Sequence, residues 1–198
     1  MTEVYPPERY LEIGAHLGTE LKTGYMRKFI FKSRRDGLKV LDIETIDKRI
    51  TATAKLLSQY KPSEICLVAR RSYGQRAVKS AAKIIGAQAV TGRFLPGLFT
   101  NPIGKEFIEP KIVLVIDPQV DKQAVKEAVG RGIPIIALAT TMNKVQNIDL
   151  VIPINNRGKK ALAFALMGIT KELLKERGEI KKDDEFKHTI DEFEYKRK

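Results

Sequence analysis

Short apolar runs alternate with longer amphipathic segments from residue 44 onward, and this alternation restricts the fold more than any other feature of the sequence. Strands are expected at 65–69, 88–91, 111–117, 134–140 and 148–154. Helices are expected at 44–60, from Ser72 onward, at 121–130 and at 158–177. Apolar runs of about four to eight residues are typical of strands buried on both faces of a parallel sheet. The pattern therefore predicts strand–helix–strand units with right-handed crossovers, and a three-layer α/β/α domain.

The two ends of the chain depart from this alternation. Near the N-terminus, an Asp36-Gly37 turn between apolar runs predicts a β-hairpin, preceded by a short helix that Pro6 and Pro7 begin. The C-terminal end is highly charged and lacks periodicity, so we expect a tail that is disordered alone or ordered on a partner. The expected divisions are 1–36 for the N-terminal helix and basic hairpin extension, 37–177 for the α/β/α domain and 178–198 for the charged tail.

The charge balance points to a polyanionic partner. Lys and Arg number 36 against 24 Asp and Glu, a formal net charge of +12, which favours nucleic acid first and an anionic membrane second. The single cysteine, Cys66, lies in an apolar run, and the two histidines lie at opposite ends of the chain, so neither a disulfide nor a metal site is expected. We see no targeting peptide and no membrane-length apolar run, which predicts a cytoplasmic protein.

The stretch 65–105 contains seven basic residues and no acid. Within it, Ser72 and Gln75 have the spacing of a capping box, which predicts the start of a helix. Arg76, Lys79 and Lys83 then fall on one helical face, where they repel one another unless an anion is present. An RNA backbone is one such anion, and a solvated basic face is the alternative.

The loop 92–101, GRFLPGLFTN, combines apolar side chains with a cation. Phe94, Leu95 and Phe99 stand beside Arg93 in a segment interrupted by glycine and proline. Exposed aromatic rings in such a loop would suit base stacking or the docking of a partner. The alternative is a loop that folds back over its own core.

Further cations cluster near the N-terminus and before the last helix. Arg34 and Arg35 are expected at the hairpin tip, and Arg157, Lys159 and Lys160 at a helix N-terminus, where cations oppose the helix dipole and so favour an external anion. The complete expected set of RNA-binding residues is Lys22, Arg27, Lys28, Arg34, Arg35, Arg70, Arg71, Arg76, Lys79, Lys83, Arg93, Arg157, Lys159 and Lys160.

No catalytic site, cofactor or small-molecule substrate is expected. Neither a dinucleotide-binding nor a P-loop glycine motif follows any expected strand. Asp117 is followed by Pro118 and Gln119, so it is interpreted as the end of a strand, where Asp117→Asn is tolerated or mildly destabilising. His16 is interpreted as a structural hydrogen-bonding residue. Two alternatives remain: an α/β enzyme or binding protein for a phosphorylated ligand, with Arg70, Arg71 and Arg93 as its clamp, and an interaction protein that works through its tail.

Three motifs resemble a known family. They are YLEIGAHLG, GRFLPGLFTN, and EPKIVLVIDPQVDKQAVKEAVGRGIPIIAL running into IDLVIPINNRG. The chain resembles small-subunit ribosomal proteins of the S2 family, from the archaeal and eukaryotic branch, from Tyr10 to about Gly178. The resemblance implies a flavodoxin-like sheet, no catalysis, and binding to small-subunit rRNA between head and body among neighbouring ribosomal proteins. The chain lacks the helical insertion of bacterial members and the long acidic extension of eukaryotic ones.

Overall fold

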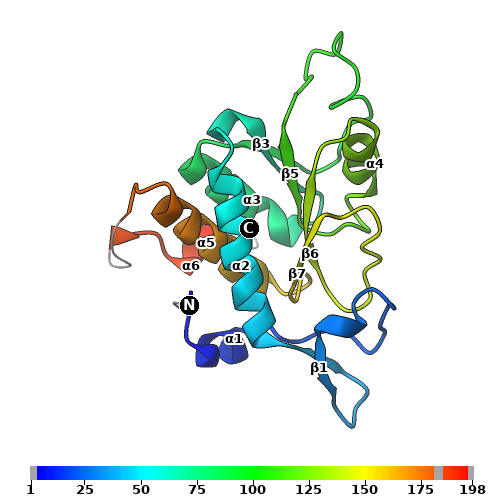
Figure 1. Ribbon diagram of the computed structural model, residues 1–198, viewed down its shortest axis with the longest axis vertical. Helices are drawn as coiled ribbons and strands as arrows, with labels where there is room; N and C mark the ends of the chain where they lie inside the picture. The colour runs from blue at the N-terminus through cyan, green and yellow to red at the C-terminus, as the bar shows by residue number, and fades with distance from the viewer. Residues whose placement is uncertain (1–3, 181–184, 196–198) are drawn as a thin grey trace.

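The computed structural model describes residues 4–180 and 185–195, and its centre is a five-stranded parallel sheet (Figure 1). The strand order is β4-β3-β5-β6-β7, which is the order of a flavodoxin-like doubly wound sheet. The strands are β3 (Ile65–Ala69), β4 (Gln88–Thr91), β5 (Ile112–Val115), β6 (Ile135–Ala139) and β7 (Leu150–Pro153). β3, β5 and β6 are buried along their whole length, as their continuous apolar sequences require. The expected three-layer α/β fold is confirmed.

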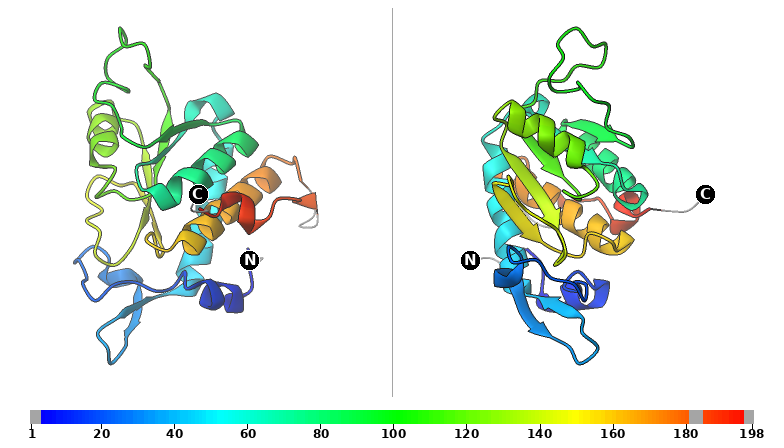
Figure 2. Two further views of the ribbon diagram at one scale, coloured as in Figure 1. Left: turned by 180° about the vertical axis from the view of Figure 1, so that it is seen from behind. Right: turned by 90° about the vertical axis from the view of Figure 1, so that its right-hand side faces the viewer.

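Three helices cover one face of the sheet. They are α2 (Ile43–Ser58), α3 (Ser72–Ile85) and α5 (Lys159–Glu176). Their apolar residues join those of the strands in the larger of two hydrophobic clusters. α5 is buried around most of its circumference from Ala161 to Leu174 because α2 and α3 flank it (Figure 2). The expected capping box on α3 is wrong: the N-cap is Arg71, and the Gln75 side chain instead donates to the Arg70 carbonyl at 2.9 Å.

The opposite face is covered by α4 (Lys122–Gly130) and by the loop 92–111. β4 lies on one side of β3 in the sheet and β5 lies on the other, so the connections β3–β4 and β4–β5 run in opposite directions across the sheet. Because both crossovers are right-handed, they must cover opposite faces of the sheet. The first crossover contains α3, whereas the second contains no helix. The loop therefore supplies the apolar cover itself, with Phe94 and Phe99 buried in a second cluster beside Val68 and Val113.

The N-terminal segment lies against the carboxyl edge of the sheet, at the lower end of Figure 1. It contains α1 (Pro7–Ile13), the 3-10 turn η1 (Arg27–Phe29) and an antiparallel hairpin of β1 (Ile30–Ser33) and β2 (Lys39–Leu41), which confirms the predicted hairpin. A second 3-10 turn, η2 (Pro62–Glu64), precedes β3. Backbone bonds from Thr23 to Thr141 and from Asn155 to Ala15, each 2.9 Å, attach the segment to the loops after β6 and β7.

Residues 185–195 pack on the chain's own helices and include α6 (Ile190–Phe193). Phe193 is fully buried, and the Glu192 carbonyl accepts hydrogen bonds from Ser80 Oγ at 2.8 Å and from Arg76 Nε at 3.2 Å. For these residues, the expectation of a tail that is disordered alone or ordered only on a partner is wrong. The remainder of the expected tail beyond residue 180 lies outside the described residues, and the divisions at residues 36 and 177 stay predictions.

Candidate nucleic-acid interface

A buried polar network occupies the carboxyl edge of the sheet between β3 and β5. Asp117, which follows β5, accepts two hydrogen bonds from the Arg71 guanidinium at 2.6 and 2.9 Å. Its other oxygen accepts from Asn143 Nδ2 at 2.9 Å and from the Gln119 backbone at 3.0 Å. Asn156 Nδ2 lies 3.1 Å from Asn143 Oδ1 and within reach of the Ile116 and Leu138 carbonyls. These side chains fill the crevice in which doubly wound proteins usually hold a ligand.

This network bears on two expectations. Arg71 was expected to face a phosphate, but its guanidinium is committed to a carboxylate that is only 1% exposed. Asp117 was expected to be a simple strand end, but it is the acceptor that joins Arg71 on the β3 side to Asn143 after β6. The Arg71 guanidinium therefore has a partner within the chain, and a contact between Arg71 and a phosphate stays a prediction.

Asp121 adjoins this network, and its pKa differs from that of an ordinary aspartate. Its carboxylate accepts from the backbone N–H groups of Arg70 at 2.9 Å and Asp117 at 3.0 Å. Burial raises the pKa of Asp121 to about 6, against the opposing effect of those two hydrogen bonds.

We expect Asp121 to make the free energy of unfolding fall as pH rises from about 4 to 6. In that interval the native state holds a proton that the unfolded state has lost, so the slope is negative, up to about 1.4 kcal/mol per pH unit. Urea unfolding of the wild type and of Asp121→Asn across this pH range gives two curves of unfolding free energy against pH. The difference between the two curves is the contribution of Asp121. Parallel curves would contradict it.

The hairpin and the segment before it form a basic end, which we define as Lys22, Arg27, Lys28, Lys32, Arg34 and Arg35. All six side chains are exposed, and none forms an ion pair with an acid in the described part of the chain. Lys28 Nζ instead lies 5.1 Å from the centre of the Phe29 ring. Asp36 and Glu20 are exposed nearby in sequence but leave a clear excess of positive charge.

Arg157 continues this charge beside the N-terminal segment. Its guanidinium lies 2.6 Å from Met142 Sδ, in the same loop to which Thr19 and Thr23 are hydrogen-bonded. Gly158 is the N-cap of α5, and Asn155 Oδ1 accepts hydrogen bonds from the Arg157 and Gly158 backbones. Cations from residues more than a hundred positions apart thus share one end of the molecule.

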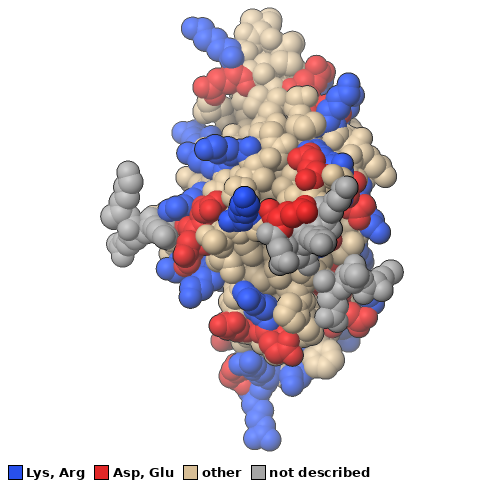
Figure 3. All heavy atoms as spheres, turned by 90° about the vertical axis from the view of Figure 1, so that its left-hand side faces the viewer, with Lys and Arg blue, Asp and Glu red and all other residues tan. Residues whose placement is uncertain are grey.

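The cations of α3 have a different environment from the one expected. Arg76 donates to the C-terminal segment, and Lys159 at the start of α5 lies 3.3 Å from Glu194 of the same segment. Lys79 and Lys83 remain exposed. Figure 3 shows the side of the molecule that lies at the left of Figure 1, on which basic and acidic side chains are interspersed. Arg76 thus has a partner in the C-terminal segment, and the role of the α3 cations in rRNA binding stays a prediction.

The aromatic loop is also not the surface that was expected. Phe94 and Phe99 are 6% and 1% exposed, with ring centres 5.0 Å apart in an edge-to-face arrangement. Glu127 of α4 anchors the loop by accepting from the Gly97 and Phe99 backbones at 2.8 and 3.1 Å. Burial would raise the pKa of Glu127, but these and neighbouring hydrogen bonds outweigh burial and hold it below its usual range. Of the three apolar residues, only Leu95 is exposed.

The amino edge of the sheet contrasts with the basic end. Lys111 pairs with Glu64 at 2.6 Å and Arg131 pairs with Glu109 at 3.1 Å, so positive charge there is locally balanced. Arg70 and Arg93, at the carboxyl ends of β3 and β4, are exposed and form no ion pair in the described part of the chain. Arg70 and Arg93 therefore lack the acidic partners that Lys111 and Arg131 have at the amino edge.

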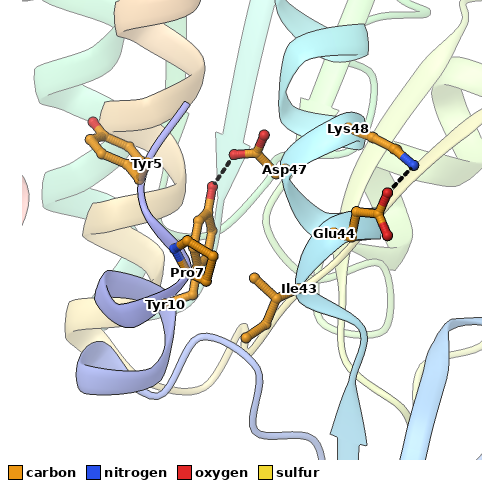
Figure 4. A pocket seen from close by; sticks show the side chains of 7 residues that line it. All are labelled: Tyr5, Pro7, Tyr10, Ile43, Glu44, Asp47 and Lys48. Carbon is orange, nitrogen blue, oxygen red and sulfur yellow. Dashed lines mark hydrogen bonds and ion pairs between the residues drawn. The ribbon is translucent and has the colours of Figure 1, made fainter. Parts of the chain in front are cut away.

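Other features offer little chemistry. A hollow of about 220 Å³ beside α1 is crossed by the 2.7 Å hydrogen bond from Tyr10 to Asp47, which joins α1 to α2 (Figure 4). Among residues 4–180 and 185–195, no cluster of three or more His, Cys, Asp or Glu side chains could hold a metal ion. No helix in those same ranges is long and apolar enough to cross a bilayer.

Comparison with known proteins gives a consistent result. The family described as Ribosomal protein S2 matches residues 10–109 and 103–175. "Small ribosomal subunit protein uS2" of Staphylothermus marinus is 46% identical over 191 residues, covering 96% of this chain and 87% of the relative. Proteins of the same name from Thermoplasma acidophilum and Saccharolobus solfataricus are 46% and 45% identical and also cover 96% of this chain, matching 95% and 82% of their own lengths.

Proposed function

This chain belongs to the ribosomal protein S2 family, and from that premise we propose that it binds small-subunit rRNA through the basic end and contacts neighbouring ribosomal proteins. Family membership makes it a structural ribosomal protein of the cytoplasm, not an enzyme. The proposal concerns its binding partners within the subunit and the residues that contact them.

The observation that carries the proposal is the group of six exposed cations of the basic end that have no acidic partner among the described residues. At the amino edge, by contrast, Lys111 and Arg131 each pair with an acid. Like charges held this close repel one another, so an external polyanion stabilises the arrangement. The hairpin places Arg34 and Arg35 at the tip of a two-stranded projection, which suits contact with phosphates along an RNA groove.

The proposed contacts differ from the set expected from sequence. Lys22, Arg27, Lys28, Arg34, Arg35, Arg70, Arg93, Arg157 and Lys160 remain exposed candidates, joined by Lys32, while Arg71 is held by Asp117. Arg76 and Lys159 contact the C-terminal segment, and Lys79 and Lys83 are exposed on the neighbouring helix α3. We propose that these four residues contribute less to rRNA binding than the basic end does.

We expect the triple variant Arg27→Gln/Arg34→Gln/Arg35→Gln to weaken binding to purified small-subunit rRNA and to flatten its salt dependence. Each lost phosphate contact reduces the slope of log K against log salt by about 0.7–0.9, so the magnitude of the slope falls by about 2–3. Filter binding or fluorescence anisotropy at several salt concentrations measures this.

A matched control is available at the other edge. Lys61, Lys111 and Arg131 are also exposed, and their replacement by glutamine removes the same charge. We expect that control to change the slope by less than half as much. Equal slopes for the two triple variants would assign the salt dependence to net charge alone and contradict a located interface.

The alternative of a phosphorylated small-molecule ligand is not favoured by the carboxyl edge. The crevice between β3 and β5 contains the Arg71–Asp117 pair and two asparagines, and a ligand there would have to break them.

A further inference from the structure

A hollow of about 390 Å³ lies between the hairpin and α1, within the basic end. This volume is at the lower end of the roughly 300–1,000 Å³ typical of ligand sites. Phe31 and Leu11 contribute its apolar surface and are 69% and 52% exposed. Phe31 belongs to β1 and lies at a register irregularity between Ile30 and Lys32, both of which pair with β2.

His16 contributes a ring nitrogen that has no hydrogen-bond partner among the described residues. The residue lines the hollow and is 5% exposed, and its Nδ1 lies 3.2 Å from the Tyr10 carbonyl oxygen. A carbonyl can only accept, so Nδ1 is the donor in this contact, and in the tautomer with its single proton on Nδ1 the Nε2 atom is an acceptor. No described residue donates to Nε2. The hollow thus contains a hydrogen-bond acceptor to which an N–H or O–H group of a ligand can donate.

The rim of the hollow is positively charged. Lys32 and Arg34 line it, and neither forms an ion pair with a described acid. Lys32 Nζ lies 6.0 Å from the centre of the Phe31 ring. The one acid in the lining, Asp42, caps α2 by accepting from the Thr45 backbone and hydroxyl, so its charge is directed at that helix.

We propose that this hollow binds one unstacked base of RNA, an inference that rests on the proposed function. The base stacks on Phe31, one of its N–H groups donates to His16 Nε2, and its flanking phosphates contact Lys32 and Arg34. A planar aromatic ligand with an N–H donor and adjacent negative charge satisfies all three features at once. An apolar side chain of a neighbouring protein would cover Phe31 and Leu11 but leave the histidine and both cations unpaired.

The test compares Phe31→Ala with Tyr25→Ala in binding to purified small-subunit rRNA. Tyr25 is a suitable control because it is 56% exposed, belongs to the same N-terminal segment and does not line the hollow. We expect Phe31→Ala to lower affinity at least fivefold, as loss of one stacked base implies, with an unchanged salt slope. We expect Tyr25→Ala to stay within twofold of the wild type.

Nucleotide-resolution chemical probing of the complex gives the second measurement. We expect one base to be protected from base-specific reagents by the wild type and to become reactive with Phe31→Ala, while the melting temperature of the free protein is unchanged. Wild-type affinity and protection in Phe31→Ala would overturn the base site. If that variant binds rRNA normally but fails to enter subunits, the occupant is a protein and the inference is also overturned. A flat salt response of the wild type would instead contradict the proposed function itself.

Discussion

Replacing Phe99 by alanine lowers the free energy of unfolding by about 3–5 kcal/mol, the usual cost of removing a fully buried aromatic ring. Phe99 is 1% exposed and lies edge-to-face against Phe94 in the cluster that covers β3 and β5. The loop has little freedom to collapse into the resulting cavity, because Glu127 holds its backbone at Gly97 and Phe99. Thermal unfolding should show a drop in melting temperature of about 6 °C or more for a chain of this length.

Leu95→Ala in the same loop is the matched control. Leu95 is 48% exposed, so its truncation should change stability by no more than about 0.5 kcal/mol. An unchanged melting temperature for Phe99→Ala, combined with failure to enter subunits, would show that the aromatic pair serves an interface after all. The structure leads us to expect the opposite: Phe99 is needed for stability, and loss of assembly follows from loss of folded protein.

Asp117→Ala should destabilise the protein by about 3 kcal/mol. It leaves the Arg71 charge and the Asn143 amide without their shared acceptor at a site where Asp117 is 1% exposed. Removing one member of a buried ion pair typically costs about 3–5 kcal/mol, and the 29% exposure of Arg71 places this case at the lower end, since water can reach part of the guanidinium. From the sequence we expect only a mild effect for Asp117→Asn. The structure leads us to expect a larger one, because the asparagine amide would direct a donor at Arg71.

The double variant Arg71→Met/Asp117→Ala distinguishes a charge effect from lost packing. With both partners gone no unpaired charge remains, so the double variant should be less destabilised than the two single changes added together. Simple additivity, measured by urea unfolding of all four proteins, would contradict the assignment. Retained rRNA affinity per folded molecule in these variants would confirm that the network is structural.

The sequence by itself determined the elements and their class. Continuous apolar runs at β3, β5 and β6 could belong only to strands buried on both faces, and the amphipathic spacing of α2 and α3 could belong only to helices covering them. The Asp36-Gly37 turn was sufficient to predict the hairpin. These features depend on interactions between residues close in sequence, whose periodicity can be read directly.

The candidate interface could be predicted in composition but not in arrangement. Its exposed cations were identified from charge alone, yet three of the proposed contacts turned out to have partners: Arg71, Arg76 and Lys159 contact distant residues. Ion pairs such as Arg71–Asp117 span 46 positions, and no local pattern encodes them. The orientation of His16 toward a hollow likewise had no signal in the sequence.

Only the tertiary structure decided the role of the aromatic loop. Its composition suited either an exposed docking surface or a buried cover, because a Gly/Pro-rich segment with two phenylalanines has no periodicity to assign a face. The strand order settles the matter: the return from β4 to β5 must cross the face opposite α3, and in the absence of a helix Phe94 and Phe99 are the side chains available to exclude water there. Burial of these rings is thus a consequence of the sheet's topology, a property of the whole chain that local sequence does not contain.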